Sequence, residues 1–392
     1  MRIKDIVKLR TKSIIPNHET MYHLYSLPSF DENQNFEVLS GEEIQSNKFI
    51  VPDKCILFNK LNVRFKRVWR IDNKNVNKLC STEFLPLVVD ESKVDYQYCY
   101  YLLISDKITN YLCGQNTNTS GSHKRIDPED FLNISITLPK MSIQKCIGRI
   151  LYDFDQKIAL NHAINDNLEK MAKQLYDYWF VQFDFPDENG RPYKSNGGAM
   201  VWNEKLKREI PKGWSFKTIK DFMRIFTGKK DVSKAIPGDY KFFSCAPEPI
   251  TSNEYIYDGY VVLVSGNGSY TGRVGFYKGK FDLYQRTYAC VLDEKPYDIS
   301  FFYYTLKYLF QPIYSGGKHG SSIPYIVLGD LADFKFAFQE RTYRLFVNAV
   351  RPMFDEQLIR QHEIETLTKQ RDELLPLLMN GQVSLNYHLS DD

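Results

Sequence analysis

The feature that most constrains this fold is a pattern of landmark residues that occurs twice, 200 residues apart. The segment Phe154-Asp155-Gln156-Lys157-Ile158 aligns with Phe354-Asp355-Glu356-Gln357-Leu358 at that offset. The same offset superposes further pairs, namely Ser122 on Ser322, Ile126 on Ile326, Asp130 on Asp330, Ile150 on Val350 and Leu175 on Leu375. Solenoid repeats are much shorter, at roughly 20 to 50 residues. The sequence therefore predicts one large module that is used twice.

Each copy begins with a compact, strand-rich part. Alternating or continuous apolar segments predict strands at 54–58, 84–89 and 260–264. Apolar residues at helical spacing predict a single helix at 96–108 in the first copy and a helical segment at 299–310 in the second.

A long helix follows each compact part. From Ser142 to about Phe180 the apolar residues recur in steps of three and four, with one break between Ile158 and Ile164. This spacing predicts a coiled-coil-like seam with a stutter. The second helix is expected from 339 to 379, where Pro352 should kink it or shift its start.

These patterns predict an α+β protein in which two globular domains alternate with two long helices. The expected segments are a first globular domain at 1–139, a helical spacer at 140–184, a linker with a second globular domain at 185–338, and a distal helical spacer with a frayed tail at 339–392.

Composition excludes several classes of protein. The formal net charge is only +3, so contact with a polyanion would depend on local patches. The seven cysteines include no CxxC pair, which argues against a disulfide framework and against a zinc site. The first residues hold no apolar signal core, and the apolar runs are too short to cross a bilayer. We expect a cytoplasmic protein without a membrane partner.

Several segments resemble the specificity subunits of type I restriction-modification systems. The central helix and its exit carry the resemblance at 147–151, 154–161, 164–169 and 179–183. Further matches are 197–202 and 210–214 at the entry of the second domain, and 373–381 near the end. The first domain lacks the lead-in found at Pro211-Lys212-Gly213-Trp214, but Ile3-Lys4-Asp5-Ile6 is similar to Ile219-Lys220-Asp221-Phe222.

The resemblance implies two target recognition domains that each grip one half of a bipartite double-stranded DNA target. The two helices would pack as an antiparallel coiled coil and hold those domains apart. Two methyltransferase subunits would dock on the helices, and restriction subunits would join where the complex cuts DNA. The chain itself would be non-catalytic and without a cofactor. S-adenosylmethionine would belong to the methyltransferase partner, and ATP and magnesium to the restriction partner.

Basic residues among aromatic ones mark DNA-binding candidates in the first domain, because phosphate attraction needs Lys and Arg, and base reading favours forked Arg donors. The candidates are Lys60, Arg64, Lys66, Arg67, His123, Lys124 and Arg125, with Arg70 nearby. The alternative is an ordinary solvated strand face.

The candidates in the second domain follow the same reasoning. They are Lys229, Lys230, Asn267, Arg273, Lys278, Arg286, Lys318, His319, Ser321 and Ser322. The alternative for the last four is a flexible loop. The glycine-rich segment 266–272 is not a dinucleotide-binding loop, because its third glycine comes one position late and a strand follows where a helix is needed.

Trp179 and Phe180 end the first helix, and they either pack the helix against a domain or form a contact for a partner subunit. Two other functions stay open: a self-contained DNA-modifying enzyme and a coiled-coil assembly scaffold. The chain has neither a GxxxxGK[ST] loop nor an Asn/Asp-Pro-Pro-Tyr/Phe methyltransferase motif, which favours the recognition subunit over an enzyme.

Overall fold

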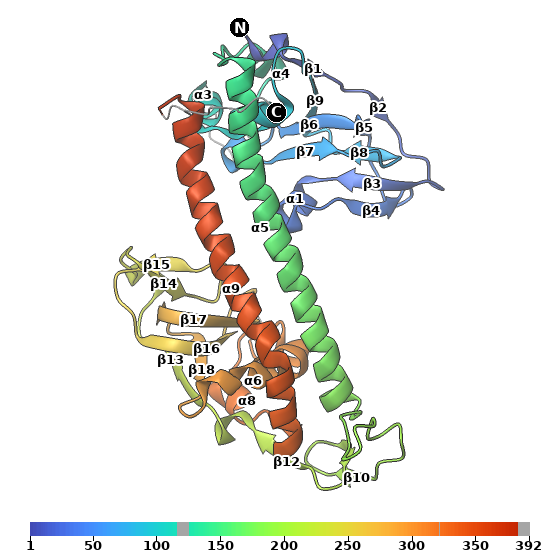
Figure 1. Ribbon diagram of the computed structural model, residues 1–392, viewed down its shortest axis with the longest axis vertical. Coiled ribbons are helices and arrows are strands. Elements are labelled where there is room, and N and C mark those ends of the chain that lie inside the picture. The colour runs from blue at the N-terminus through green and yellow to red at the C-terminus, as the bar shows by residue number, and fades with distance from the viewer. Residues whose placement is uncertain (116–124, 321, 383–392) are drawn as a thin grey trace, which may run out of the picture. The chain divides into compact units, whose positions relative to one another are not determined.

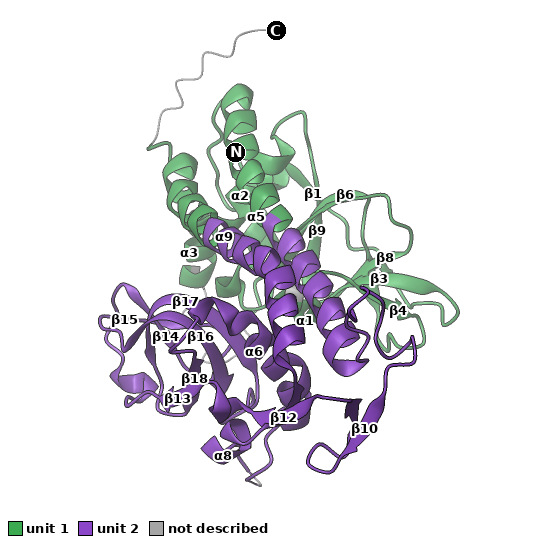
Figure 2. Ribbon diagram, turned by 60° about the horizontal axis from the view of Figure 1, so that its bottom comes forward, with its two compact units in different colours: residues 1–160, 364–392 green, residues 161–363 purple. Residues whose placement is uncertain are grey.

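The computed structural model describes residues 1–115, 125–320 and 322–382 (Figure 1). Its chain divides into two compact units (Figure 2). Unit 1 comprises residues 1–160 and 364–392, and unit 2 comprises residues 161–363. The two long helices, α5 (Met141–Tyr176) and α9 (Glu340–Met379), contribute residues to both units.

The globular part of unit 1 contains two sheets. The first has the order β1 (Val7–Leu9), β9 (Phe84–Val89), β6 (Lys54–Asn59) and β7 (Val68–Asp72). The second has the order β2 (Ser13–Ile14), β5 (Lys48–Ile50), β8 (Lys78–Cys80), β3 (Met21–Tyr25) and β4 (Glu37–Ser40). The helical elements are η1 (Ile3–Asp5), α1 (Leu27–Asn33), η2 (Val63–Phe65), α2 (Tyr96–Ile104), α3 (Asp106–Gln115) and α4 (Pro128–Leu132).

Strand β6 is buried on both faces, which explains its continuous apolar sequence. Ile56 and Phe58 belong to the core formed with α2 and α5, while Cys55 and Leu57 belong to a second core that includes Trp69. The predicted strands at 54–58 and 84–89 are confirmed as β6 and β9.

Unit 2 has one large sheet with the order β13 (Arg224–Thr227), β18 (Thr287–Val291), β16 (Tyr257–Ser265), β17 (Val274–Leu283), β14 (Tyr240–Phe243) and β15 (Ile250–Ser252). Two small antiparallel pairs accompany it, β10 (Met200–Asn203) with β11 (Arg208–Pro211), and β12 (Ser215–Thr218) with β19 (Lys335–Phe338). The helical elements are η3 (Asp177–Val181), η4 (Ile219–Asp221), η5 (Val232–Lys234), η6 (Pro296–Asp298), α6 (Ile299–Thr305), η7 (Leu306–Phe310), α7 (Gln311–Tyr314) and α8 (Leu328–Ala332).

The two units share one strand plan, so the repeated module is confirmed. The order β1, β9, β6, β7 in unit 1 corresponds to β13, β18, β16, β17 in unit 2, and all three neighbouring pairs are antiparallel in both units. The similar segments at 3–6 and 219–222 form matching 3-10 turns, η1 and η4, before the first strand. The predicted strand at 260–264 is the buried centre of β16.

The helices α5 and α9 run in opposite directions in unit 2. There Asn161 bonds Arg360 and Glu169 bonds Gln357, so the partner's number in α9 falls as the number in α5 rises. In unit 1 Arg371 of α9 bonds Asp155 of α5. At the predicted stutter, Asn161 is fully buried and bonds Arg360 of α9. A buried polar residue in a seam fixes its register.

One expectation about helices is corrected, and one of the two alternatives for Pro352 is excluded. The segment 96–108 is not a single helix, because Ser105 adopts an extended conformation with ψ of 150° and separates α2 from α3. Its buried hydroxyl donates to the Leu102 carbonyl, and its own carbonyl accepts from the Thr109 N–H, so Ser105 ends one helix and starts the next. The second long helix runs without a break from Glu340 through Pro352, so the proline does not shift its start.

Gly148 of α5 permits a close approach of α2. A side chain there would place its Cβ 2.7 Å from the Asp95 carboxylate and 2.8 Å from the Tyr98 nitrogen, and Asp95 caps α2 by accepting from that nitrogen. The single glycine in this helix is therefore a packing requirement.

The segment 187–198, expected to be a linker, is held by local hydrogen bonds. Asp184 accepts from both the backbone and the hydroxyl of Ser195, and Asp187 accepts from the backbone of Asn189 and Arg191. All seven cysteines are free thiols. None of the helices within the described residues is long and apolar enough to cross a membrane. The expected frayed tail lies outside the described residues from 383 onward.

Candidate nucleic-acid interface

A nine-residue loop of one design occurs in both units, at 59–67 and at 265–273. Each loop is counted from the last residue of the preceding strand, β6 or β16, and ends just before the next strand, β7 or β17. In unit 1 the Asn59 N–H donates to the Arg67 carbonyl at 3.0 Å, and in unit 2 the Ser265 N–H donates to the Arg273 carbonyl at 3.0 Å. The fourth residue of each loop has a left-handed backbone, with φ of 52° at Asn62 and 80° at Gly268.

Each loop is tied to the segment that carries the repeated isoleucine. The Ile126 N–H donates to the Lys60 carbonyl at 3.0 Å, and the Ile326 N–H donates to the Gly266 carbonyl at 2.9 Å. The residue before each isoleucine forms a bridge with the loop, Arg125 with Leu61 and Tyr325 with Asn267. The two landmarks found in the sequence therefore hold equivalent places in the two units.

In each unit the loop lies at the same end of the sheet as the last residues of the first strand, β1 or β13, and the first residues of the fourth strand in chain order, β9 or β18. Strands β6 and β9 run antiparallel, so the end of β6 lies beside the start of β9, where the Lys60 N–H donates to the Glu83 carbonyl. In unit 2 the Gly266 N–H donates to the Arg286 carbonyl at 2.9 Å. We refer to these two regions as the loop edges of units 1 and 2.

Five basic candidates of the first domain lie at the loop edge of unit 1, and three of them are paired with carboxylates. Arg67 makes two bonds to Asp31, Lys66 contacts Asp106 at 2.6 Å, and Arg125 makes a two-pronged bond to Glu83.

The two other basic candidates at this edge have no carboxylate partner among the residues that the structure describes. Arg64 is exposed and lies 4.8 Å from the ring centroid of Phe65, which is itself 52% exposed. Lys60 is half-buried and makes no side-chain bond within the described residues. Arg64 and Lys60 are thus the cations of this loop that are available to a polyanion.

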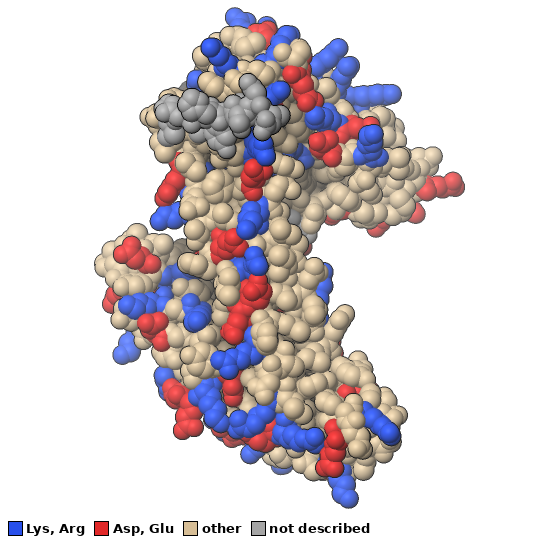
Figure 3. Space-filling view, viewed as in Figure 1, with Lys and Arg blue, Asp and Glu red and all other residues tan. Residues whose placement is uncertain are grey.

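Two basic residues that we did not predict lie at the same edge, Arg10 and Lys12. Both are exposed and neither forms an ion pair within the described part of the chain. They follow β1, and the Arg10 N–H donates to the carbonyl of Pro86 in β9. Lys and Arg side chains gather over the region of β1 and β2 (Figure 3). The signal in the sequence was the alternation Lys8-x-Arg10-x-Lys12, which places three cations on one face of an extended chain.

The loop edge of unit 2 brings together candidates from three separate segments. Asn267, Arg273 and Arg286 lie on or beside the loop, and Lys229 and Lys230 follow β13, where the Gln285 N–H donates to the Lys230 carbonyl. The segment of Lys318, His319 and Ser322 is joined to the loop by hydrogen bonds, including one from the Gly268 N–H to the Pro324 carbonyl.

Some side chains at this edge already bond other residues of the chain, and others do not within the described residues. Arg273 donates to the carbonyls of Ala246 and Pro247, and Lys230 pairs with Glu254 and Asp282. Lys229 and Arg286 are exposed and form no ion pair within the described residues.

Other candidates in the segment after α7 are also engaged. The Nζ atom of Lys318 lies 4.2 Å from the ring centroid of Tyr314, and His319 Nε2 lies 3.1 Å from Asp330.

Some candidates lie elsewhere. Lys278 is in the middle of β17, and its Nζ atom lies 4.8 Å from the ring centroid of Tyr260. A hydrogen bond with Tyr260 raises the pKa of Lys278, and the nearby negative charge of Asp355 in α9 raises it further. His123, Lys124 and Ser321 lie outside the described residues.

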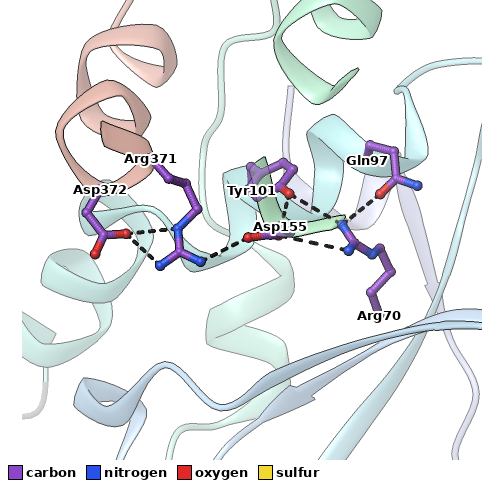
Figure 4. Close-up of polar contacts among 6 residues, drawn as sticks. All are labelled: Arg70, Gln97, Tyr101, Asp155, Arg371 and Asp372. Carbon is purple, nitrogen blue, oxygen red and sulfur yellow. Dashed lines mark hydrogen bonds and ion pairs between the residues drawn. The ribbon is translucent and has the colours of Figure 1, made fainter. Parts of the chain in front are cut away.

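Arg70 belongs to a polar cluster that fastens the globular part of unit 1 to both helices (Figure 4). The centre is Asp155 of α5, which accepts from Tyr101 of α2 at 2.5 Å and from Arg371 of α9 at 2.9 Å. Arg70 of β7 lies 3.9 Å from the same carboxylate and bonds Gln97 at 2.9 Å. Its guanidinium is therefore turned toward the helices and not toward the loop edge.

Unit 2 has a comparable cluster around Glu169 of α5. Its carboxylate accepts from Lys307 at 2.7 Å, from Tyr308 at 2.5 Å and from Gln357 of α9 at 3.2 Å. Burial by itself would raise the pKa of Glu169, but the positive charge of Lys307 and these hydrogen bonds outweigh it and hold the pKa below its ordinary value.

Glu169→Gln should therefore lower the free energy of unfolding of unit 2 by about 1.5–3 kcal/mol near neutral pH, because Lys307 loses its partner. A carboxyl group whose pKa is depressed on folding stabilises the fold above its unfolded pKa, and this contribution is lost as the pH falls. Denaturation at several pH values should show that the difference in free energy of unfolding between the wild-type chain and Glu169→Gln is largest above the ordinary Glu pKa of 4.5 and becomes smaller below it. A gap that does not change with pH would show that the ion pair contributes nothing.

Phe180 packs inside unit 2 and offers no surface to a partner. It is 3% exposed and contacts the rings of Trp214, Phe301 and Phe346. Trp179 is half-buried against the same core. Both residues lie in the π-helical turn η3, where the Gln182 N–H donates to the Asp177 carbonyl.

Two units with one plan, each with a loop edge whose exposed cations form no ion pair within the described residues, are typical of a protein that contacts a polyanion at two places. Comparison with known proteins agrees: the model of the type I restriction modification DNA specificity domain matches residues 1–170 and 211–338. The chain belongs to this family.

Relatives and a solved structure support the assignment. The chain is 25% identical over 338 residues to the type I restriction enzyme MjaIX specificity subunit of Methanocaldococcus jannaschii, covering 78% of this chain and 73% of the relative. It is 30% identical over 182 residues to the EcoDI specificity subunit of Escherichia coli, covering 45% of this chain and 40% of the relative. Its fold is similar to the crystal structure of the S subunit of a type I restriction-modification system from M. genitalium, with a TM-score of 0.61, 16% identity and coverage of 96% and 95% of the two chains.

Proposed function

We propose that this chain is a non-catalytic specificity subunit whose two loop edges each read one half of a bipartite double-stranded DNA target. The observation that carries the proposal is the recurrence of one loop, at one sheet edge, in both units of a chain of the specificity family. A base-reading surface has to differ between two half-sites, while the scaffold that presents it can stay the same.

The two loop edges carry different side chains on that shared scaffold. At matching loop positions unit 1 has Lys60 and Leu61 where unit 2 has Gly266 and Asn267. Exposed cations such as Arg10 and Lys12 suit contacts with phosphates, which position a protein on DNA, whereas contacts with base edges supply the sequence preference.

The chemistry of the complex is assigned to partner subunits. Methyl transfer would use S-adenosylmethionine on two methyltransferase subunits, and cleavage would use ATP and magnesium on a restriction subunit. Support for docking on the helices comes from unit 2, where a groove of about 550 Å³ is lined by Met171, Leu175, Tyr178 and Met353. Met171 and Tyr178, two apolar residues of the segment at 142–180, are 51% and 38% exposed.

The test compares the purified chain with its complex. The chain alone should neither methylate nor cleave DNA, whereas the chain with methyltransferase subunits and S-adenosylmethionine should methylate one bipartite sequence. Mapping of methylated bases by sequencing supplies the measurement, and methyltransferase subunits without this chain are the control. Methylation of a defined site by the chain alone would overturn the proposal.

A further inference from the structure

Two further pairs of equivalent positions differ between the loop edges. Glu83 and Arg286 both accept, through their carbonyls, the N–H of the second loop residue, and Arg125 and Tyr325 both bridge the third loop residue. The structural equivalence therefore matches Glu83 with Arg286, and Arg125 with Tyr325.

In unit 1 this position is closed by an ion pair. The Arg125 guanidinium donates through Nε and Nη2 to the Glu83 carboxylate at 2.9 to 3.0 Å. A two-pronged pair of this kind uses the donors that would otherwise bind an anion.

In unit 2 the same position is open. Arg286 is exposed and makes no ion pair or side-chain hydrogen bond within the described residues. It lines a cavity of about 330 Å³ together with Gly266, Gln285, Tyr288, Tyr325 and Ile326.

The wall of this cavity is built closely around the arginine. A side chain at Gly266 would bring its Cβ to 2.2 Å from the Arg286 carbonyl and 3.0 Å from the Tyr288 ring, so glycine is required for this close approach of the loop to the Arg286 backbone. Tyr288 is held by a hydrogen bond from its hydroxyl to the Ile326 carbonyl at 3.3 Å. Asp330, whose charge acts on Tyr288, is already bonded by the Val327 N–H and by His319.

We propose that this cavity receives a backbone phosphate of the DNA and that Arg286 binds it, which rests on the proposed function. Phosphate groups project from a duplex and can enter a hollow, whereas the edges of stacked bases lie within a groove and need a side chain that protrudes. Two tyrosines, Tyr288 and Tyr325, line the cavity with Arg286, and the arginine is exposed, so an anion can reach its guanidinium from solvent. Unit 1 lacks this anchor, because its counterpart of Arg286 is Glu83, whose carboxylate is paired with Arg125.

The experiment measures DNA binding by the complex of this chain with its methyltransferase subunits at several salt concentrations. Arg286→Gln should weaken binding about tenfold, equally for the target and for DNA with an altered second half-site. It should also reduce the slope of log affinity against log salt by about one. Arg286→Lys should keep the slope, because lysine retains the charge.

The matched control is Lys335→Gln, which removes an exposed cation of unit 2 on β19, a strand of a different sheet, and should leave the slope unchanged. An unchanged slope and affinity in Arg286→Gln would overturn the proposal. A changed preference for one base would also overturn it, because Arg286 would then read sequence. Absence of any sequence preference in the wild-type complex would instead reject the proposed function, so the two failures are distinguishable.

Discussion

Phe301→Ala is expected to lower the free energy of unfolding of unit 2 by about 3–5 kcal/mol, because it removes a large ring from a well-packed core. Phe301 is fully buried and its ring contacts Phe180, Tyr343 and Phe346. These rings come from α6, η3 and α9, so a cavity there weakens the attachment of the globular part to both helices within the unit.

Urea denaturation would measure the loss of stability, and hydrogen exchange on the native protein would show which unit is destabilised. Amides of unit 2 should lose protection in Phe301→Ala, while amides of β6 and β9 in unit 1 should keep it. Phe65→Ala is the control, since Phe65 is 52% exposed and an exposed position should change stability by less than about 0.5 kcal/mol. A loss below 1 kcal/mol in Phe301→Ala would mean that the core refills the cavity.

Lengthening both helices by four residues is expected to change the DNA target of the complex. The insertions would follow Leu160 in α5 and Glu363 in α9, where the two units meet in the chain. Four residues add roughly 6 Å to a helix at 1.5 Å per residue. DNA rises about 3.4 Å per base pair, so the preferred spacer should grow by one or two pairs while the bases in each half stay the same.

Sequencing of methylated sites is the measurement for this variant. Insertion in α5 alone is the control, because it lengthens one helix without the other, shifts the register of α5 against α9 and should lower activity without defining a new spacer. An active double insertion that keeps its original spacer would show that the helices do not set the distance.

Much of the architecture was predictable from local pattern. The continuous apolar strands and the long helical spacing depend on residues close together in the chain, and the repeat is found by comparing two such local segments that lie 200 residues apart. The break at Ser105 was not predictable, because apolar residues continue across it and only the hydroxyl of Ser105 with the carbonyl of Leu102 reveals the end of the helix. The continuity of α9 through Pro352 likewise overrode a local preference.

The sequence by itself determined that this protein has two copies of one module, two long helices and clusters of basic residues in each globular part. Only the tertiary structure decided which of those cations remain available to DNA. Arg64 and Arg67 are three residues apart, yet among the described residues only Arg67 has a carboxylate partner, Asp31, at a separation of 36 residues. Arg125 is neutralised by Glu83 at a separation of 42 residues, while Arg286, the counterpart of Glu83, forms no ion pair in the part of the chain that the structure describes. The pairing of a charge depends on neighbours brought close by strand register and loop closure, and no local pattern records these neighbours.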